Sequence, residues 1–124
     1  MPTLRLARAR RALLRHALRH PESHEDHPWG EDVVKVRGKI FVFLGMPPDD
    51  RMSVTVKLPE SSSVALMEPF AEPSGYGLGR AGWVTLTFGP DDQPPIGVLC
   101  QWIDESYRAV APRRLARQIL PGSM

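Results

Sequence analysis

The sequence predicts a two-layer α+β domain, in which a five-stranded antiparallel sheet is packed by helices in the order α-β-β-β-α-β-β-α. Apolar and polar residues alternate strictly from Met52 to Leu58, which is typical of a strand with one buried face. Apolar residues recur every three or four positions in residues 3–19 and 95–110, which is typical of helices with one buried face. The length of 124 residues suits one domain, expected to span residues 1–124 with its core at about residues 4–118.

In the first half of the chain, a helix over residues 3–19 precedes three strands and a short helix. The apolar stripe of the first helix consists of Leu6, Ala9, Leu13 and Ala17. The helix ends before Pro21, because a residue that precedes proline is pushed out of the α region. A hairpin over residues 32–45 turns at Gly38, where glycine accepts a positive φ. The short helix opens at Pro59.

In the second half, two strands and a long helix are expected. Ser74–Leu78 is predicted to be an edge strand that pairs with Trp83–Phe88 through a turn at Gly79–Gly82. The long helix opens at Pro95, and residues 113–120 form a short basic helical tail. The apolar stripe of the long helix consists of Ile96, Leu99, Ile103, Tyr107 and Val110.

Charge is distributed unevenly along a chain whose net charge is only +2. Residues 1–20 hold six arginines and no acid, whereas residues 21–32 hold five acids and neither lysine nor arginine. The acidic segment could neutralise part of the basic helix, or the helix could present a basic surface to phosphates. The sequence leaves both interpretations open.

Cysteine content and hydropathy exclude several classes of protein. The single cysteine, Cys100, allows no internal disulfide and no cysteine-rich zinc site, which favours a reducing, cytoplasmic compartment. Its place beside the apolar stripe of the last long helix indicates a core residue rather than a nucleophile. No apolar run approaches the roughly 18 residues of a membrane span. With no elbow motif and no facing carboxylate pair, we expect no catalytic residue and no cofactor.

Two segments contain residues that could bind a ligand. His20, His24 and His27 lie close to Glu25 and Asp26, and a metal-dependent hydrolase built on His24, Glu25 and His27 is a minor alternative. A polar loop is favoured, because these histidines are expected on a flexible loop and not on the face of a rigid helix. Residues 77–82 match GxGxxG, but a strand follows them where a dinucleotide site needs a helix.

Basic residues near aromatic ones indicate a possible nucleic-acid-binding surface. Strand ribbons and their connecting turns can enter a groove while lysine and arginine contact phosphates. The same residues are also expected on ordinary solvated faces. The candidate phosphate-binding residues are Arg37, Lys39, Lys57 and Arg80 on or beside strands, and Arg8, Arg11 and Arg15 on the first helix.

Several short motifs occur together between about residues 10 and 118. One is Glu25-Asp26-His27-Pro28-Trp29-Gly30, and another is Ile103-Asp104-Glu105-Ser106-Tyr107. Through these motifs the chain resembles the MmcQ/YjbR family of small bacterial proteins. The positions that carry the resemblance are Glu25, Asp26, Pro28, Trp29, Gly30, Gly38, Tyr76, Trp83, Asp104, Ser106 and Tyr107.

The resemblance implies a fold like that of CyaY-like and secretion-chaperone domains, and a "double wing" DNA-binding role. It favours a non-enzymatic DNA-binding protein, with a protein- or peptide-binding module as the alternative. Where relatives carry His-x-Asn-Lys, this chain has Gly77-Leu78-Gly79-Arg80, which keeps only the positive charge. The oligomeric state is left open.

Overall fold

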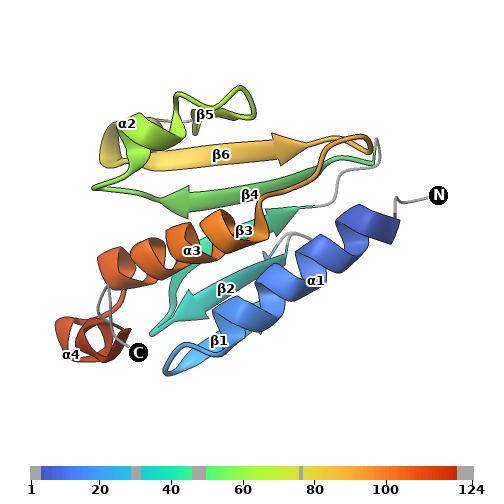
Figure 1. Ribbon diagram of the computed structural model, residues 1–124. Coiled ribbons are helices and arrows are strands. Elements are labelled where there is room, and N and C mark those ends of the chain that lie inside the picture. Colours follow the sequence, from blue (N-terminus) through green and yellow to red (C-terminus); the bar gives the residue numbers. More distant parts are fainter. Residues whose placement is uncertain (1–3, 29–31, 46–49, 76, 120–124) are drawn as a thin grey trace.

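The computed structural model describes residues 4–28, 32–45, 50–75 and 77–119. Six strands form one antiparallel sheet in the order β1-β2-β3-β4-β6-β5 (Figure 1). The strands are β1 (Ser23–Asp26), β2 (Asp32–Val36), β3 (Lys39–Gly45), β4 (Met52–Lys57), β5 (Ala71–Pro73) and β6 (Trp83–Phe88). The helices are α1 (Leu4–Leu18), α2 (Ser62–Ala65), η2 (Leu78–Ala81), α3 (Ile96–Val110), α4 (Arg113–Ala116) and η3 (Arg117–Ile119). The predicted α+β class is confirmed.

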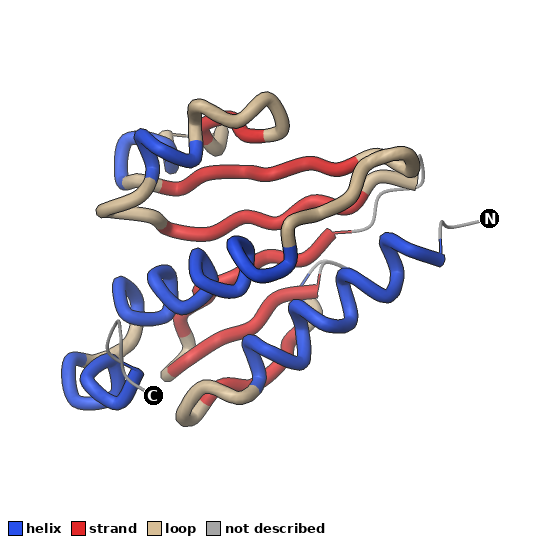
Figure 2. The backbone as a smooth tube through the Cα atoms, viewed as in Figure 1, coloured by secondary structure: helices blue, strands red, loops and turns tan. Residues whose placement is uncertain are grey.

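The hydrophobic core lies between one face of the sheet and the two long helices, α1 and α3 (Figures 1 and 2). Alternate residues of β4 and β6, such as Val54 and Leu86, are fully buried in this core. From the helices, Leu13 of α1 and Ile103 of α3 are buried against them. The stripes that predicted both helices are therefore the stripes that pack on the sheet. None of the described helices is long and apolar enough to cross a membrane.

The predicted number of strands was wrong by one, because the acidic segment forms an edge strand. Residues 23–26 pair antiparallel with β2, so that Ser23 lies opposite Val36 and Asp26 opposite Val33. All four residues of β1 are polar and none is buried. Since no apolar face has to be covered, this strand carries no period-two pattern, and the backbone ladder alone defines it.

The expected edge strand at residues 74–78 was also misplaced. The edge strand that pairs with β6 is β5, at Ala71–Pro73, and residues 78–81 form the η2 helix instead of a hairpin turn. Gly77 and Gly82 flank η2 with φ of 78° and 92°. Such left-handed conformations suit glycine, so these glycines allow a tight helical turn before β6.

The β2–β3 hairpin turns where the sequence predicted it. Arg37 and Gly38 have φ of 52° and 80°, as a two-residue hairpin turn with positive φ at both positions requires. Farther along β3, the register shifts by one residue, because Val34 pairs with Val42 while Lys35 pairs with Ile40. Phe41 is the extra residue of this bulge, and its side chain is fully buried in the core.

Candidate functional site

Four consecutive residues of α3, Asp104 to Tyr107, each attach the helix to a different part of the fold. Asp104 contacts the end of α1, Glu105 the start of α2, Ser106 strands β3 and β4, and Tyr107 the loop after α1. Three of the four side chains, those of residues 105–107, are buried. This part of the family motif is therefore placed to fix the helix layer on the sheet.

Ser106 bridges two backbone groups that β3 and β4 leave apart. Its hydroxyl donates to the carbonyl oxygen of Phe41 at 2.5 Å and accepts from the N–H of Lys57 at 2.8 Å. Phe41 and Lys57 are the chain neighbours of Val42 and Val56, the pair at this end of the β3–β4 ladder. The hydroxyl thus extends the ladder at the bulge.

Glu105 and Tyr107 bind backbone groups of loops. The Glu105 carboxylate accepts from the N–H groups of Glu60 and Ser61, at 2.9 and 3.0 Å, and from the Ser61 hydroxyl at 2.6 Å. The Tyr107 hydroxyl donates to the carbonyl oxygen of Pro21 at 2.7 Å. Burial, followed by the charge of Glu22, raises the pKa of Tyr107.

Two histidines of the α1 end converge on Asp104. The Nε2 atoms of His16 and His20 lie 2.7 and 2.8 Å from the same oxygen, Asp104 Oδ1. Burial raises the pKa of Asp104, but the contacts with both imidazoles outweigh burial and hold this pKa well below its usual value of 3.8. The carboxylate is therefore strongly favoured in its ionised form. We call these three residues the His16–His20–Asp104 cluster.

We expect the Asp104→Asn variant to be less stable than the wild type at neutral pH. A carboxyl whose pKa is lower in the folded state stabilises the fold above its unfolded-state pKa, and this contribution is lost as the pH falls through the folded pKa. The difference in the free energy of unfolding should therefore be full above about pH 4 and should shrink below it. Urea titrations at several pH values measure this difference. A constant difference across the acid range would contradict the assignment.

The two acidic residues of the motif that begins at Glu25, Glu25 and Asp26, both form ion pairs. Asp26 lies 2.7 Å from Lys35 Nζ, and its carboxylate accepts from the backbone N–H of His27 at 2.8 Å. These bonds, that of Lys35 first, lower the pKa of Asp26. Pro28 follows the strand and is half-buried, while Trp29, Gly30 and Tyr76 lie outside the described residues.

Glu25, His27 and Asp32 form a second group of potential metal ligands, besides the His16–His20–Asp104 cluster. His27 contacts Asp32 through Nδ1 and lies 3.3 Å from Glu25 through Nε2. Asp32 is also paired with the Arg10 guanidinium, so part of its charge is already neutralised. Burial, opposed by the charge of Glu25, lowers the pKa of Arg10. His24, the third residue of the predicted set, is exposed on β1 and does not belong to this group.

The basic candidates do not form one surface. Arg37 is bound to Glu22, with Nε–Oε1 and Nη2–Oε2 distances of 2.6 and 3.2 Å, and this contact raises its pKa. Lys57 is half-buried and follows core-facing Val56, so it lies on the sheet face opposite the helices. Arg80 is exposed in η2, and Lys39 is exposed at the start of β3.

By contrast, one helix face is rich in exposed arginines. Arg8, Arg11 and Arg15, together with Arg19 just after α1, are all exposed on the side opposite Leu13. Among the described residues, none of the four has an acidic partner. We call these four residues the arginine face. Of the seven arginine and lysine candidates, only the three on α1 lie together in this way.

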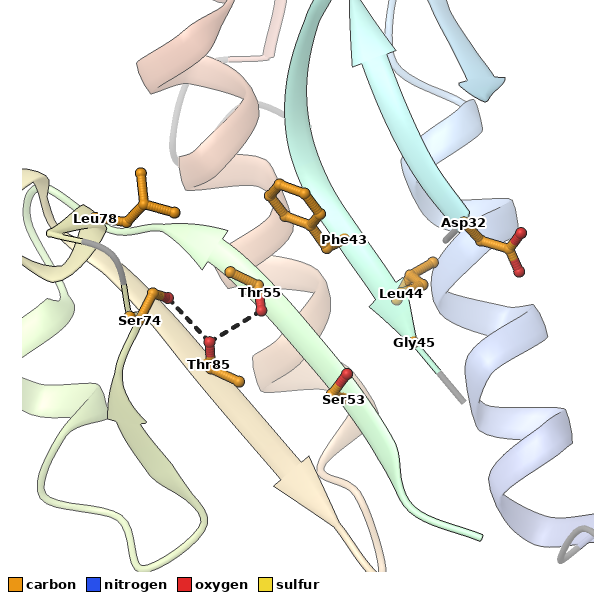
Figure 3. A pocket seen from close by; sticks show the side chains of 10 residues that line it. Asp32, Phe43, Leu44, Gly45, Ser53, Thr55, Ser74, Leu78 and Thr85 are labelled. Atoms are coloured by element: carbon orange, nitrogen blue, oxygen red, sulfur yellow. Dashed lines mark hydrogen bonds between the residues drawn. The ribbon is translucent and has the colours of Figure 1, made fainter. Parts of the chain in front are cut away.

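The uncovered face of the sheet contains a cleft of about 230 Å³ (Figure 3). Its apolar lining includes Phe43, Leu44 and Leu78. The hydroxyls of Thr55 and Ser74 lie 3.0 and 2.9 Å from Thr85 Oγ1, so the threonine joins the polar side of the cleft. Trp83, half-buried at the start of β6, packs edge-to-face on Phe43 with ring centroids 5.9 Å apart. The volume is below the several hundred Å³ of typical small-molecule sites.

The His16–His20–Asp104 cluster was not predicted from the sequence. The predicted histidines were the three after the helix, although His16 and His20 have the i,i+4 spacing that places two side chains on one helix face. Asp104 lies 88 residues from His16, so only the packing of α1 on α3 brings them together.

Comparison with known proteins agrees with the motifs. None of the curated proteins compared with the chain matches it. Among solved structures, the chain is similar to the crystal structure of Deinococcus radiodurans protein DR2400, with its DUF419 domain, at 23% sequence identity and a TM-score of 0.66. The match covers 90% of this chain and 88% of that one, and at this identity it supports the fold alone. The model of the YjbR family matches residues 18–109, and the chain therefore belongs to the YjbR family.

Proposed function

We propose that this protein is a non-enzymatic DNA-binding protein that contacts phosphates through the arginine face of α1. The observation that carries the proposal is that Arg8, Arg11, Arg15 and Arg19 are exposed on one side of the fold without an acidic partner among the described residues. Unpaired guanidinium groups bind phosphates well, because their planar donors match the phosphate oxygens.

The spacing of the arginine face suits a nucleic-acid backbone. Along a helix that rises about 1.5 Å per residue, Arg8 and Arg19 are separated by roughly 16 Å. One DNA strand carries a phosphate about every 3.4 Å along the duplex axis, so a row of this length spans several phosphates. The hairpin candidates are a weaker surface, because Arg37 already binds Glu22 and Lys57 faces away from α1.

The test is the salt dependence of binding to a fluorescent DNA duplex, measured by anisotropy. Four phosphate contacts predict a slope of log K against log salt near −3.6, and each removed arginine should reduce the slope by about 0.9. The triple variant Arg8→Gln/Arg11→Gln/Arg15→Gln should therefore bind at least about tenfold more weakly at low salt, with a slope near −0.9. Glutamine keeps helix propensity, so α1 should remain folded.

A matched control removes the same charge from the other candidates. The variant Lys39→Gln/Lys57→Gln/Arg80→Gln should retain most of the affinity and the slope of the wild type. If this control loses binding while the α1 variant keeps it, then the hairpin and η2 contact DNA and the arginine face does not. If the wild type binds no duplex, the DNA-binding proposal fails.

A protein- or peptide-binding module is the second candidate, and the cleft beside Phe43 and Leu78 favours it. Its size suits one side chain of an extended segment, and Leu78 is 40% exposed at its rim. An apolar contact of this kind would respond little to salt. Leu78→Asp should then abolish capture of a partner protein, but it should leave DNA binding through α1 unchanged.

A further inference from the structure

We propose that the His16–His20–Asp104 cluster binds a divalent transition-metal ion, with the two imidazole Nε2 atoms and the Asp104 carboxylate as its protein ligands. The three donor atoms lie within 4.8 Å of one another. Two nitrogens and one carboxylate oxygen are ligands that Zn²⁺ accepts, typically with a water in the remaining position. This inference is independent of DNA binding.

The placement of the two histidines is the first support. His16 lies in the last turn of α1, and His20 follows it by four residues, so both rings are on the side of α1 that faces α3. Backbone bonds from Arg19 N to His16 O and from His20 N to Ala17 O continue the turn beyond the helix end. His20 is therefore tied by a backbone hydrogen bond to the end of α1, as the positioning of a metal ligand requires.

The second support is a buried nitrogen without a hydrogen bond. His20 is only 9% exposed, and its Nε2 atom has no hydrogen-bond partner among the described residues. The atom lies 2.8 Å from Asp104 Oδ1, but it approaches this oxygen outside hydrogen-bond geometry. Buried polar atoms are nearly always hydrogen-bonded, so a nitrogen that the described residues engage through this ion pair alone is poorly satisfied. A metal ion bound by both the nitrogen and the carboxylate would satisfy it.

The distances require only a small adjustment. Ligands about 2.1 Å from a tetrahedral zinc ion are separated by about 3.4 Å, against 2.7 and 2.8 Å between the imidazoles and Asp104 Oδ1. The contacts of Asp104 with His16 and His20 would have to open by about 0.7 and 0.6 Å, and the side chains of His16 and Asp104 are 26% and 30% exposed.

The surroundings hold one side of the site and leave the other open. The His20 ring packs against Tyr107 and Phe41, with ring centroids 4.8 and 6.1 Å apart, so its orientation is fixed. The partial exposure of His16 and Asp104 gives an ion a path from solvent. The other histidine–carboxylate group is a poorer site, because the Arg10 guanidinium already occupies Asp32.

The test uses tag-free protein stripped with a chelator, and ZnCl₂ or CoCl₂ as the probe. Calorimetry of the wild type should give one zinc ion per chain, and cobalt should produce the visible absorption of a low-coordinate site with nitrogen and oxygen ligands. His16→Ala and Asp104→Asn should each weaken zinc binding at least about tenfold. His27→Ala is the matched control and should bind zinc as the wild type does.

Circular dichroism verifies that the variants are folded, and His16→Ala is expected to fold because its side chain is partly exposed. A rise in the melting temperature on adding zinc should occur in the wild type and in His27→Ala, but not in His16→Ala. The proposal is overturned if the wild type binds no stoichiometric zinc or cobalt. It is equally overturned if His27→Ala loses the metal while His16→Ala retains it.

Discussion

The Ser106→Ala variant is expected to lose about 2–4 kcal/mol of unfolding free energy, because one hydroxyl satisfies two backbone groups. Without it, the N–H of Lys57 loses its acceptor and the carbonyl oxygen of Phe41 loses its donor. Ser106 is fully buried, so water cannot readily replace the hydroxyl. Urea denaturation measures the loss. Amide hydrogen exchange should also become faster at Lys57, which identifies the site of the damage.

Ser63→Ala is the control for this variant. Ser63 is exposed in α2, and no hydrogen bond of its side chain is found among the described residues. Its removal should change stability by less than about 0.5 kcal/mol. If Ser106→Ala were equally harmless, then β3 and β4 must close directly on each other, and the bridge at the bulge would have no energetic role.

The success of the fold prediction follows from which elements are buried. For β4, α1 and α3, burial of one face imposes a spacing of apolar residues, and this spacing can be read without tertiary contacts. Strand β1 has no such face, because it consists of Ser-His-Glu-Asp at the sheet edge. Its formation depends on the free edge of β2, which the sequence of β1 does not encode. Prediction therefore failed where backbone pairing, rather than side-chain burial, decides the structure.

The same reasoning explains what was predicted of the site. The motif at Asp104 to Tyr107 could be found as a motif, but the partner of each side chain lies between 44 and 88 residues away. Asp104 and Glu105 are adjacent in α3 and contact different elements, so they do not form a carboxylate pair, as their spacing predicted. The spacing could not show that Asp104 contacts the end of α1 and that Glu105 contacts the start of α2. Likewise, Arg37 was predicted to be a phosphate-binding candidate, because the sequence does not show that it contacts Glu22. This contact is made only in the folded protein.

The Glu105→Ala variant should be destabilised by about 3 kcal/mol, because it removes the acceptor of three hydrogen bonds at the start of α2. Two of the donors are backbone N–H groups, of Glu60 and Ser61, and bonds from such groups to a charged acceptor are stronger than neutral ones. Glu105 is 6% exposed, so solvent cannot fully compensate. Chemical denaturation measures the loss, and hydrogen exchange at Ser61 locates it.

Two further variants separate charge and hydrogen bonding from a general loss of packing. Glu105→Gln keeps the shape and one acceptor oxygen, so it should cost about half as much as Glu105→Ala. Glu68→Ala removes the same side chain from an exposed position after α2 and should change stability by less than about 0.5 kcal/mol. If Glu105→Gln were as damaging as Glu105→Ala, the negative charge itself would hold α2 against α3. If Glu105→Ala and Glu105→Gln were both as stable as the wild type, the buried carboxylate would not hold α2 against α3. The attachment of α3 would then rest on Ser106 and Tyr107.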